Sequence, residues 1–512
     1  MSTEFPWWTP GQRALAQESR RLADALAPRN LEVYASGEVP ADALAEIARH
    51  GYFGAVIPQQ YGGMAEPGTV ATNLAIIMEA LGRVPAASLA YGVGCGHHIA
   101  AFGSAAQRQR WLPGLASGTI YGGVAITEPF AGSDAAGLRT TAVAGPGGPG
   151  GSWVLHGRKR FITNVGLASV LLVYARTSDD PADVRRRRHL SAFLVETGAP
   201  GFSVERLSEL GGSQYLRNGT LHFDEMHLPP ESLLGEPGDG WQIMISGLNL
   251  ERVGVAAKCL GMLDAAVITA LRYIRRRRQF GHRISDIASV RIKLGEVVSE
   301  MEAARALAYL SAHLLDSGVP DLAIDSAASK LRAAETALAG AGVALEVMGA
   351  DGYTSDYPVA QILADIKMYQ IGAGSSDVLR DLIFRMAQRR YGAALDDPPL
   401  AAQVAWPVSA DELTGPEVLR ALAVFYRQHP GLHMTGPDLL RALGEERFSA
   451  ERVGELRDLA AKELVDVMWQ GDEPALVRAT YAGLDDVAGP GFYRRPAPHD
   501  PGLGRGGPGV DL

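Results

Sequence analysis

The length, composition and charge of the chain exclude several classes of protein. Its 512 residues are too many for one hydrophobic core, so two or three domains are expected. The formal net charge of −9 argues against a general nucleic-acid binder, and Cys95 and Cys259 are too few for a disulfide framework. The first ten residues lack a basic and apolar leader, and no run of 18 apolar residues occurs. We therefore expect a soluble, cytoplasmic protein without a membrane span.

The first 119 residues have the pattern of a helical domain. Apolar residues recur at helical spacing over 11–26, 40–50, 69–81, 88–102 and 107–112. Glycine-containing turns at 51–58 and 61–63 interrupt this pattern, and Pro113 follows the last segment. We predict an N-terminal helical domain over residues 1–119, with its last helix ending before Pro113.

Residues 120–236 have a β pattern instead. Short segments rich in β-branched and aromatic residues lie at 153–157, 170–175, 191–196 and 219–223. Glycines and prolines separate these segments, which predicts an antiparallel sheet or a small barrel. Four consecutive arginines, Arg185–Arg188, fall within residues 179–189, which we expect to be a solvated loop.

Residues 237–394 return to helical periodicity. Long segments with apolar stripes and many alanines cover 241–275, 287–315, 322–348 and 365–390. Small side chains allow helices to approach closely and also suit contacts between subunits. This pattern predicts a C-terminal four-helix bundle.

Residues 395–512 form an extension after the bundle. A proline-containing linker at 396–407 precedes three helical candidates, which cover 413–429, 436–443 and 449–470. The glycine- and proline-rich residues 489–512 are expected to be disordered. The extension contains no Asp-Ser-Leu carrier-protein signature, so we do not expect it to be a tethered acyl carrier.

One polar loop lies between the first helical domain and the β segments. It reads Ala-Ile-Thr-Glu-Pro-Phe-Ala-Gly-Ser-Asp over residues 125–134. Thr127 and Ser133 offer hydroxyl groups, Gly132 allows close backbone approach, and Pro129 stiffens the turn. This chemistry suits a loop that covers a flavin, although such a loop could equally be an ordinary junction between a strand and a turn.

Several separated motifs favour the flavin interpretation, because they occur in the order and spacing found in one family. They lie at residues 61–63, 125–137, 161–164, 277–281, 349–353 and 374–377. Over roughly residues 10–392 the chain resembles the acyl-CoA dehydrogenase family of flavoproteins. The resemblance implies an α+β fold with a helical domain, a β domain and a helical bundle. It also implies an FAD cofactor and a homotetramer or homodimer.

The resemblance assigns roles to individual residues. Thr127 is expected to hydrogen-bond the flavin ring, which Ile126 also lines, and Phe161 and Thr163 to cover the other side of the ring. Arg277 and Phe280 are expected to reach the FAD of a neighbouring subunit, as a guanidinium pairs well with a pyrophosphate. Further cofactor contacts are expected from Gly349, Ser375 and Asp377, and substrate contacts from Ser133 and Arg252. No metal site is expected.

The family's reaction also requires a base. A carboxylate removes the proton next to the thioester carbonyl while a hydride leaves the following carbon for flavin N5. Many members carry this glutamate just before the Gly-Thr-Ser turn, where this chain has Ala373. The branch that includes isovaleryl- and long-chain-type enzymes carries it on the first helix of the bundle, and Glu251 matches that position, 26 residues before Arg277. We expect Glu251 to be the base and Arg252 to orient it; the alternative is an exposed surface pair.

Three functional hypotheses follow from these residues. The first is α,β-dehydrogenation of an acyl thioester, carried by CoA or by a carrier protein, with electrons passing to an electron-transfer flavoprotein or another acceptor. The second is a flavin monooxygenase or oxidase on the same fold. The third is a catalytically silent scaffold protein that binds partners through its extension.

Overall fold

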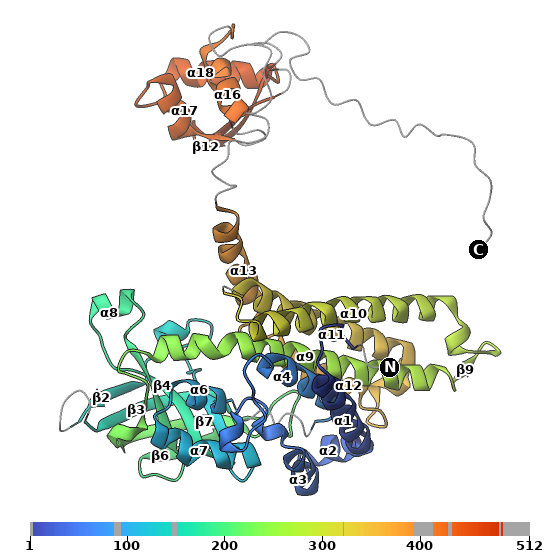
Figure 1. Ribbon diagram of the computed structural model, residues 1–512. Coiled ribbons are helices and arrows are strands. Elements are labelled where there is room, and N and C mark those ends of the chain that lie inside the picture. The colour runs from blue at the N-terminus through green and yellow to red at the C-terminus, as the bar shows by residue number, and fades with distance from the viewer. Residues whose placement is uncertain are drawn as a thin grey trace. The chain divides into compact units, whose positions relative to one another are not determined.

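The computed structural model describes residues 4–85, 94–145, 151–320, 322–392, 413–428, 433–480 and 483–484. The chain divides into two compact units, residues 1–388 and residues 389–512 (Figure 1). The first unit contains three successive domains, and the second contains the extension. The predicted linker at 396–407 and the tail at 489–512 lie outside the described residues.

The N-terminal domain is helical, as its sequence predicts. Its described helices are α1 (Pro10–Leu26), α2 (Asn30–Ser36), α3 (Ala41–Arg49), α4 (Val70–Leu81), α6 (Gly96–Phe102) and α7 (Ala105–Ser117). Thr9 and Ser104 begin α1 and α7 with capping boxes, in which their hydroxyls accept backbone N–H groups. The predicted end of α7 before Pro113 is wrong. The helix continues to Ser117, because buried Leu112 and Leu115 hold it in the core on both sides of the proline.

The middle domain is an eight-stranded sheet. Its strands are β1 (Tyr121–Ala125), β2 (Thr141–Ala144), β3 (Trp153–Thr163), β4 (Ala168–Arg176), β5 (Leu190–Glu196), β6 (Phe202–Leu207), β7 (Asn218–Leu228) and β8 (Leu233–Leu234). The strand order is β6-β7-β3-β2-β4-β5-β8, and β1 pairs with β4 in parallel. Strand β4 is buried on both faces. Its Tyr174 packs into the core shared with the N-terminal helices, whereas Val173 packs into the core of the sheet.

The expected solvated loop at 179–189 contains a single helical turn, α8 (Pro181–Arg185). Asp180 caps this turn by accepting the backbone N–H of Ala182. Arg185, Arg186 and Arg187 are exposed, so the charged segment remains a surface feature.

The C-terminal domain is a helical bundle. It contains α9 (Gly240–Ile274), α10 (Ala288–Asp316), α11 (Ala323–Met348), α12 (Val359–Tyr369) and α13 (Ser376–Arg390). A two-stranded hairpin of β9 (Arg278–Gln279) and β10 (His282–Arg283) follows α9. The single helix predicted over 365–390 is wrong. The chain turns between α12 and α13, because Ala373 and Gly374 adopt positive φ angles of 54° and 89° that no right-handed helix accommodates.

Two helices of the bundle are long and apolar enough to cross a membrane by length and composition. In α9, 78% of the most apolar window is buried against other parts of the protein, and in the segment Ala323–Tyr353 the buried share is 50%. Alanines of α11 such as Ala333, Ala337 and Ala341 are fully buried in the core shared with α9. The apolar character of these helices is therefore accounted for by packing inside the bundle.

The extension is a folded unit that combines helices with a small sheet. Its elements are α16 (Glu417–Gln428), β11 (Met434–Thr435), α17 (Gly436–Leu443), α18 (Ala450–Ala461), β12 (Val465–Gln470) and β13 (Glu473–Ala479). The three strands form an antiparallel sheet in the order β11-β13-β12. The order helix, strand, helix, helix, strand, strand is the topology of a winged helix-turn-helix.

The helix predicted over 449–470 is therefore wrong in its second half, and the extension is not purely helical. Residues 465–470 pair with β13 across a tight turn at Gly471, which has a φ angle of 69°. Buried Val465 is followed by exposed Asp466 and half-buried Val467, so this stretch follows the two-residue period of a strand.

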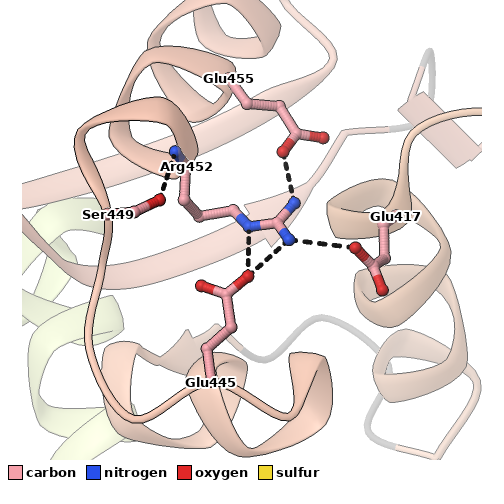
Figure 2. A network of polar contacts seen from close by, with 5 residues as sticks. All are labelled: Glu417, Glu445, Ser449, Arg452 and Glu455. Atoms are coloured by element: carbon pink, nitrogen blue, oxygen red, sulfur yellow. Dashed lines mark hydrogen bonds and ion pairs between the residues drawn. The ribbon is translucent and has the colours of Figure 1, made fainter.

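Arg452 joins the elements of this unit (Figure 2). Its guanidinium lies 2.6 Å from a carboxylate oxygen of Glu445, 2.5 Å from Glu455 and 3.0 Å from Glu417. Its backbone N–H donates to the Ser449 hydroxyl, which caps α18. The Arg452 side chain is 15% exposed, so a single cation ties α16, the turn before α18, and α18 itself around a shared core.

Candidate active site

A buried ion pair holds the loop that follows β1. The Lys159 Nζ, on β3, lies 2.7 Å from Glu128 Oε1 and donates to the carbonyl of Ile126 at 3.1 Å. The Glu128 carboxylate also accepts the backbone N–H groups of Arg139 and Thr140, at 2.7 and 3.0 Å. The start and the end of the loop are therefore fixed on one carboxylate.

Charges and burial act together on this pair. Burial lowers the pKa of Lys159 to about 8, against the attraction of Glu128. Burial raises the pKa of Glu128, but the charge of Lys159 and the hydrogen bonds outweigh this effect, so its pKa lies below the ordinary value. Sequence analysis did not identify either residue, since 31 residues separate them and neither lies at an informative spacing.

Four of the predicted flavin contacts lie close together. The carbonyl of Thr127 accepts the backbone N–H of Arg160 at 2.8 Å, which places Ile126 and Thr127 beside the end of β3 that carries Phe161 and Thr163. Ile126, Thr127 and Thr163 are half-buried. Phe161 is 51% exposed, and its backbone φ angle is 58°, an uncommon conformation that the surrounding structure must enforce. Ser133 lies further along the loop and is exposed.

Glu251 is half-buried on α9, next to polar residues of the bundle. Arg252 is only 7% exposed, and its Nη1 lies 3.4 Å from the side-chain oxygen of Asn249. The same oxygen accepts the hydroxyl of Ser326 from α11 at 2.7 Å. Burial raises the pKa of Glu251 above its ordinary value of 4.5, against the charges of Arg252 and Lys330, which lower it. The pair of Glu251 and Arg252 is therefore not an exposed surface pair.

Lys330 of α11 contacts the turn that contains Ala373 and Gly374. This α11 lysine is 0% exposed, and its Nζ donates to the Gly374 carbonyl at 2.7 Å. The loop between α12 and α13 is thereby joined to the residues around Glu251. Sequence analysis missed Lys330, although a lysine between the buried positions Ala327 and Leu331 of an alanine-rich helix was a detectable signal.

Tyr174 is a second residue that sequence analysis missed. It is fully buried on β4, and its hydroxyl has no hydrogen-bond partner among the residues that the structure describes. Burial raises the pKa of Tyr174, and the charge of Glu251 raises it further. The sheet therefore contributes a polar group to the surroundings of Glu251, which lies on α9.

Three of the remaining predicted cofactor contacts, Arg277, Phe280 and Gly349, lie toward the other end of α9, whereas Ser375 and Asp377 follow the turn that Lys330 contacts. Arg277 lines a cavity of about 900 Å³ together with Tyr273 and Asp351. Phe280, at the tip of the hairpin, is 90% exposed. Gly349 is exposed and has a φ angle of 63°. Ser375 is half-buried in the turn before α13, and Asp377 is exposed on its first turn. Figure 1 shows the β9 hairpin at the end of the bundle opposite to the sheet.

The three domains and their order define a flavoprotein oxidoreductase architecture. Residues 9–119, 123–226 and 238–388 match the N-terminal, middle and C-terminal domains of acyl-CoA dehydrogenases. The chain belongs to the acyl-CoA dehydrogenase family. Its fold class and its family, both expected from the sequence, are thus confirmed.

Individual relatives support this assignment. The chain is 35% identical over 351 residues to "Acyl-CoA dehydrogenase" of Bacillus subtilis (strain 168), covering 68% of this chain and 89% of that protein. It is 34% identical over 374 residues to mitochondrial isovaleryl-CoA dehydrogenase of Oryza sativa subsp. japonica, covering 71% and 87%. It also resembles a solved glutaryl-coenzyme A dehydrogenase in complex with glutaryl-CoA, with a TM-score of 0.70 and 31% identity over 77% of this chain and 97% of that one. The family matches end at residue 388, before the extension.

Proposed function

We propose that this enzyme dehydrogenates an acyl thioester between its α and β carbons, with Glu251 as the base that removes the α proton. The observation that carries this proposal is the half-buried position of Glu251 beside the buried Arg252, while Ala373 occupies the family's other position for the base. A desolvated carboxylate binds a proton more tightly than one in water, which suits it to abstract a weakly acidic proton. Alanine at 373 cannot accept a proton.

Arg252 supports the proposal through an atom that its protein neighbours do not use. Its Nε is buried and has no hydrogen-bond partner among the described residues. A buried donor without a partner is costly unless a ligand or water satisfies it. We propose that this donor helps to hold the thioester end of the substrate, while Asn249 fixes the guanidinium.

The residues around the β1 loop fit an FAD. The side-chain hydroxyls of Thr127 and Thr163 are half-buried donors, and Phe161 presents an aromatic face on the neighbouring strand. FAD, when bound there, would accept the hydride that leaves the β carbon. Lys159 and Glu128 would fix the loop that hydrogen-bonds the ring.

The positions of Arg277 and Phe280 support a second subunit. At a rise of about 1.5 Å per residue, the helix from Glu251 to Ile274 spans roughly 35 Å. Arg277 is therefore too far from Glu251 to contact a flavin that is bound beside Glu251 in the same chain. We propose that Arg277 and Phe280 contact the FAD of a neighbouring subunit in a homodimer or homotetramer, as the exposed Phe280 ring allows.

Anaerobic mixing with a panel of acyl thioesters tests the proposed function. Straight, branched and dicarboxylic acyl chains, each offered on CoA and on a carrier protein, are expected to bleach the flavin absorbance with different efficiencies. The preferred chain and carrier identify the substrate, and reoxidation by an electron-transfer flavoprotein identifies the acceptor. Rapid oxygen consumption with a hydroxylated product would instead indicate a monooxygenase. A purified protein that retains no FAD would indicate a scaffold.

A further inference from the structure

Lys330 is a buried cation that the proposed reaction does not yet use. It projects from α11, its side chain is 0% exposed, and its ammonium donates to the Gly374 carbonyl at 2.7 Å. Burial of an ammonium is costly unless charge and hydrogen bonds compensate for lost hydration. A lysine at such a position therefore requires a partner beyond one carbonyl oxygen.

The charged groups around Lys330 identify that partner. Ser326, one helical turn before Lys330 on α11, donates its hydroxyl to Asn249, two residues before Glu251 on α9, so these two segments are in contact. The charges that act on Lys330 are those of Glu251, Glu335 and Arg252, together with the Cys259 thiol. Glu335 pairs with Arg380 on α13, so its charge is already compensated. Glu251 has Arg252 and Lys330 as its interacting cations.

The charge of Glu251 also acts on Tyr174 of β4, but Tyr174 is neutral because burial and this carboxylate raise its pKa. Among these groups, Lys330 is thus the cation from another helix that can stabilise the Glu251 carboxylate. Burial lowers the pKa of Lys330 to about 8, which leaves it largely protonated at neutral pH.

We propose that Lys330 is a positioning residue that fixes the turn at residues 372–375 through the Gly374 carbonyl and adds its positive charge to that of Arg252 in favouring the ionised Glu251 carboxylate. The turn needs such an anchor because Ala373 has a φ angle of 54°, a strained conformation for a residue with a side chain. The charge is needed because burial alone favours the protonated carboxyl, which cannot accept a proton. This proposal rests on the proposed role of Glu251 as the base.

Three variants separate the charge of Lys330 from its hydrogen bond. Lys330→Met removes both, Lys330→Gln retains an N–H donor without charge, and Lys330→Arg retains the charge. Lys293→Met is the matched control, because Lys293 is an exposed lysine of α10 that pairs with Glu346. Each variant is purified as the FAD-loaded enzyme, and kcat/KM is measured against pH with the best thioester from the substrate panel.

Loss of the Lys330 charge should shift the acidic limb of the kcat/KM–pH profile to higher pH. A carboxylate without its neighbouring positive charge binds a proton more tightly, so its pKa rises. We expect the limb to move to higher pH by about one unit in Lys330→Met and Lys330→Gln. It should remain near the wild-type position in Lys330→Arg and in Lys293→Met.

Neutral variants that retain FAD and keep the wild-type limb would overturn the proposal. So would neutral variants that fail to fold with FAD while Lys330→Arg folds, because the charge would then serve stability rather than the base. An active Glu251→Gln enzyme would instead overturn the proposed function, whatever the Lys330 variants show. The two proposals therefore fail through different measurements.

Discussion

The ammonium of Lys159 lies 2.7 Å from the carboxylate of Glu128, in a pair whose side chains are 0% and 4% exposed. The pair joins β3 to the loop after β1, and the same ammonium donates to the Ile126 carbonyl. The loop that is proposed to cover the flavin thus depends on two charged groups that do not themselves reach the solvent.

Lys159→Met is expected to weaken both the fold and the flavin site. The substitution leaves the Glu128 carboxylate buried without its counter-ion, which costs about 3–5 kcal/mol. Differential scanning fluorimetry should show a lower Tm, and the purified protein should contain less FAD. Arg158→Met is the control, because Arg158 lies beside Lys159 but forms an exposed ion pair with Glu205. A Lys159→Met enzyme with wild-type Tm and FAD content would contradict the structural role.

The pH dependence of turnover is expected to follow Glu251. Burial raises its pKa above 4.5, and the base works only when it is deprotonated. The rate constant kcat/KM should therefore fall as pH decreases through a value above 4.5 and level off at higher pH. Rapid-mixing measurements across this range test the prediction, provided that the flavin spectrum shows an intact enzyme at each pH. A profile without an acidic limb would argue against a carboxylate base.

Arg452→Met is expected to destabilise the extension. Removal of the guanidinium leaves Glu445 and Glu455 without their shared partner, at a cost of about 1–3 kcal/mol. Chemical denaturation followed by hydrogen exchange in peptides from residues 413–480 should show an earlier transition for this unit. Arg441→Met is the control, since Arg441 is 78% exposed in its pair with Asp438 and should contribute less than about 0.5 kcal/mol. Equal midpoints for both variants would show that the network in Figure 2 does not stabilise the unit.

The extension is expected not to bind duplex DNA, despite its topology. In a helix-turn-helix, the second helix of the motif reads DNA with cationic and polar side chains. Here that helix, α18, carries Glu451, Glu455 and Asp458 against two arginines, and Arg452 is already engaged by three glutamates. Electrophoretic mobility assays at low salt with the full-length protein should show no retardation of random duplexes. Salt-dependent retardation would contradict this prediction.

The sequence predicts well those features that depend on local patterns. Periodicity locates most N-terminal helices, the strands β3, β4, β5 and β7 and the long helices of the bundle, and the order of motifs identifies the family; β1, β2, β6 and β8 are not predicted. Where two patterns compete, sequence analysis is wrong: residues 465–470 continue an amphipathic helix in the sequence, yet they pair with β13 in the sheet. Pro113 likewise lies inside α7, because core packing overrides its tendency to end a helix.

Much of the candidate site depends on contacts between distant residues. Glu251 could be chosen from its spacing to Arg277, but Lys330 meets the Gly374 carbonyl across 44 residues of sequence. Lys159 meets Glu128 across 31 residues. In the sequence, Lys330 appears only as a cation within an alanine-rich helix, and Lys159 lies between two arginines. The roles of Lys330 and Lys159 in the candidate site can therefore be inferred only from the folded structure.

Anaerobic stopped-flow reduction of the flavin in wild-type enzyme and in Glu251→Gln tests the central claim most directly. The glutamine retains the size of the glutamate but cannot remove the α proton, so reduction should slow by about 10²–10⁴-fold. The bound-flavin spectrum and the Tm should stay unchanged. Reduction of Glu251→Gln at the wild-type rate would contradict the assignment of Glu251 as the base.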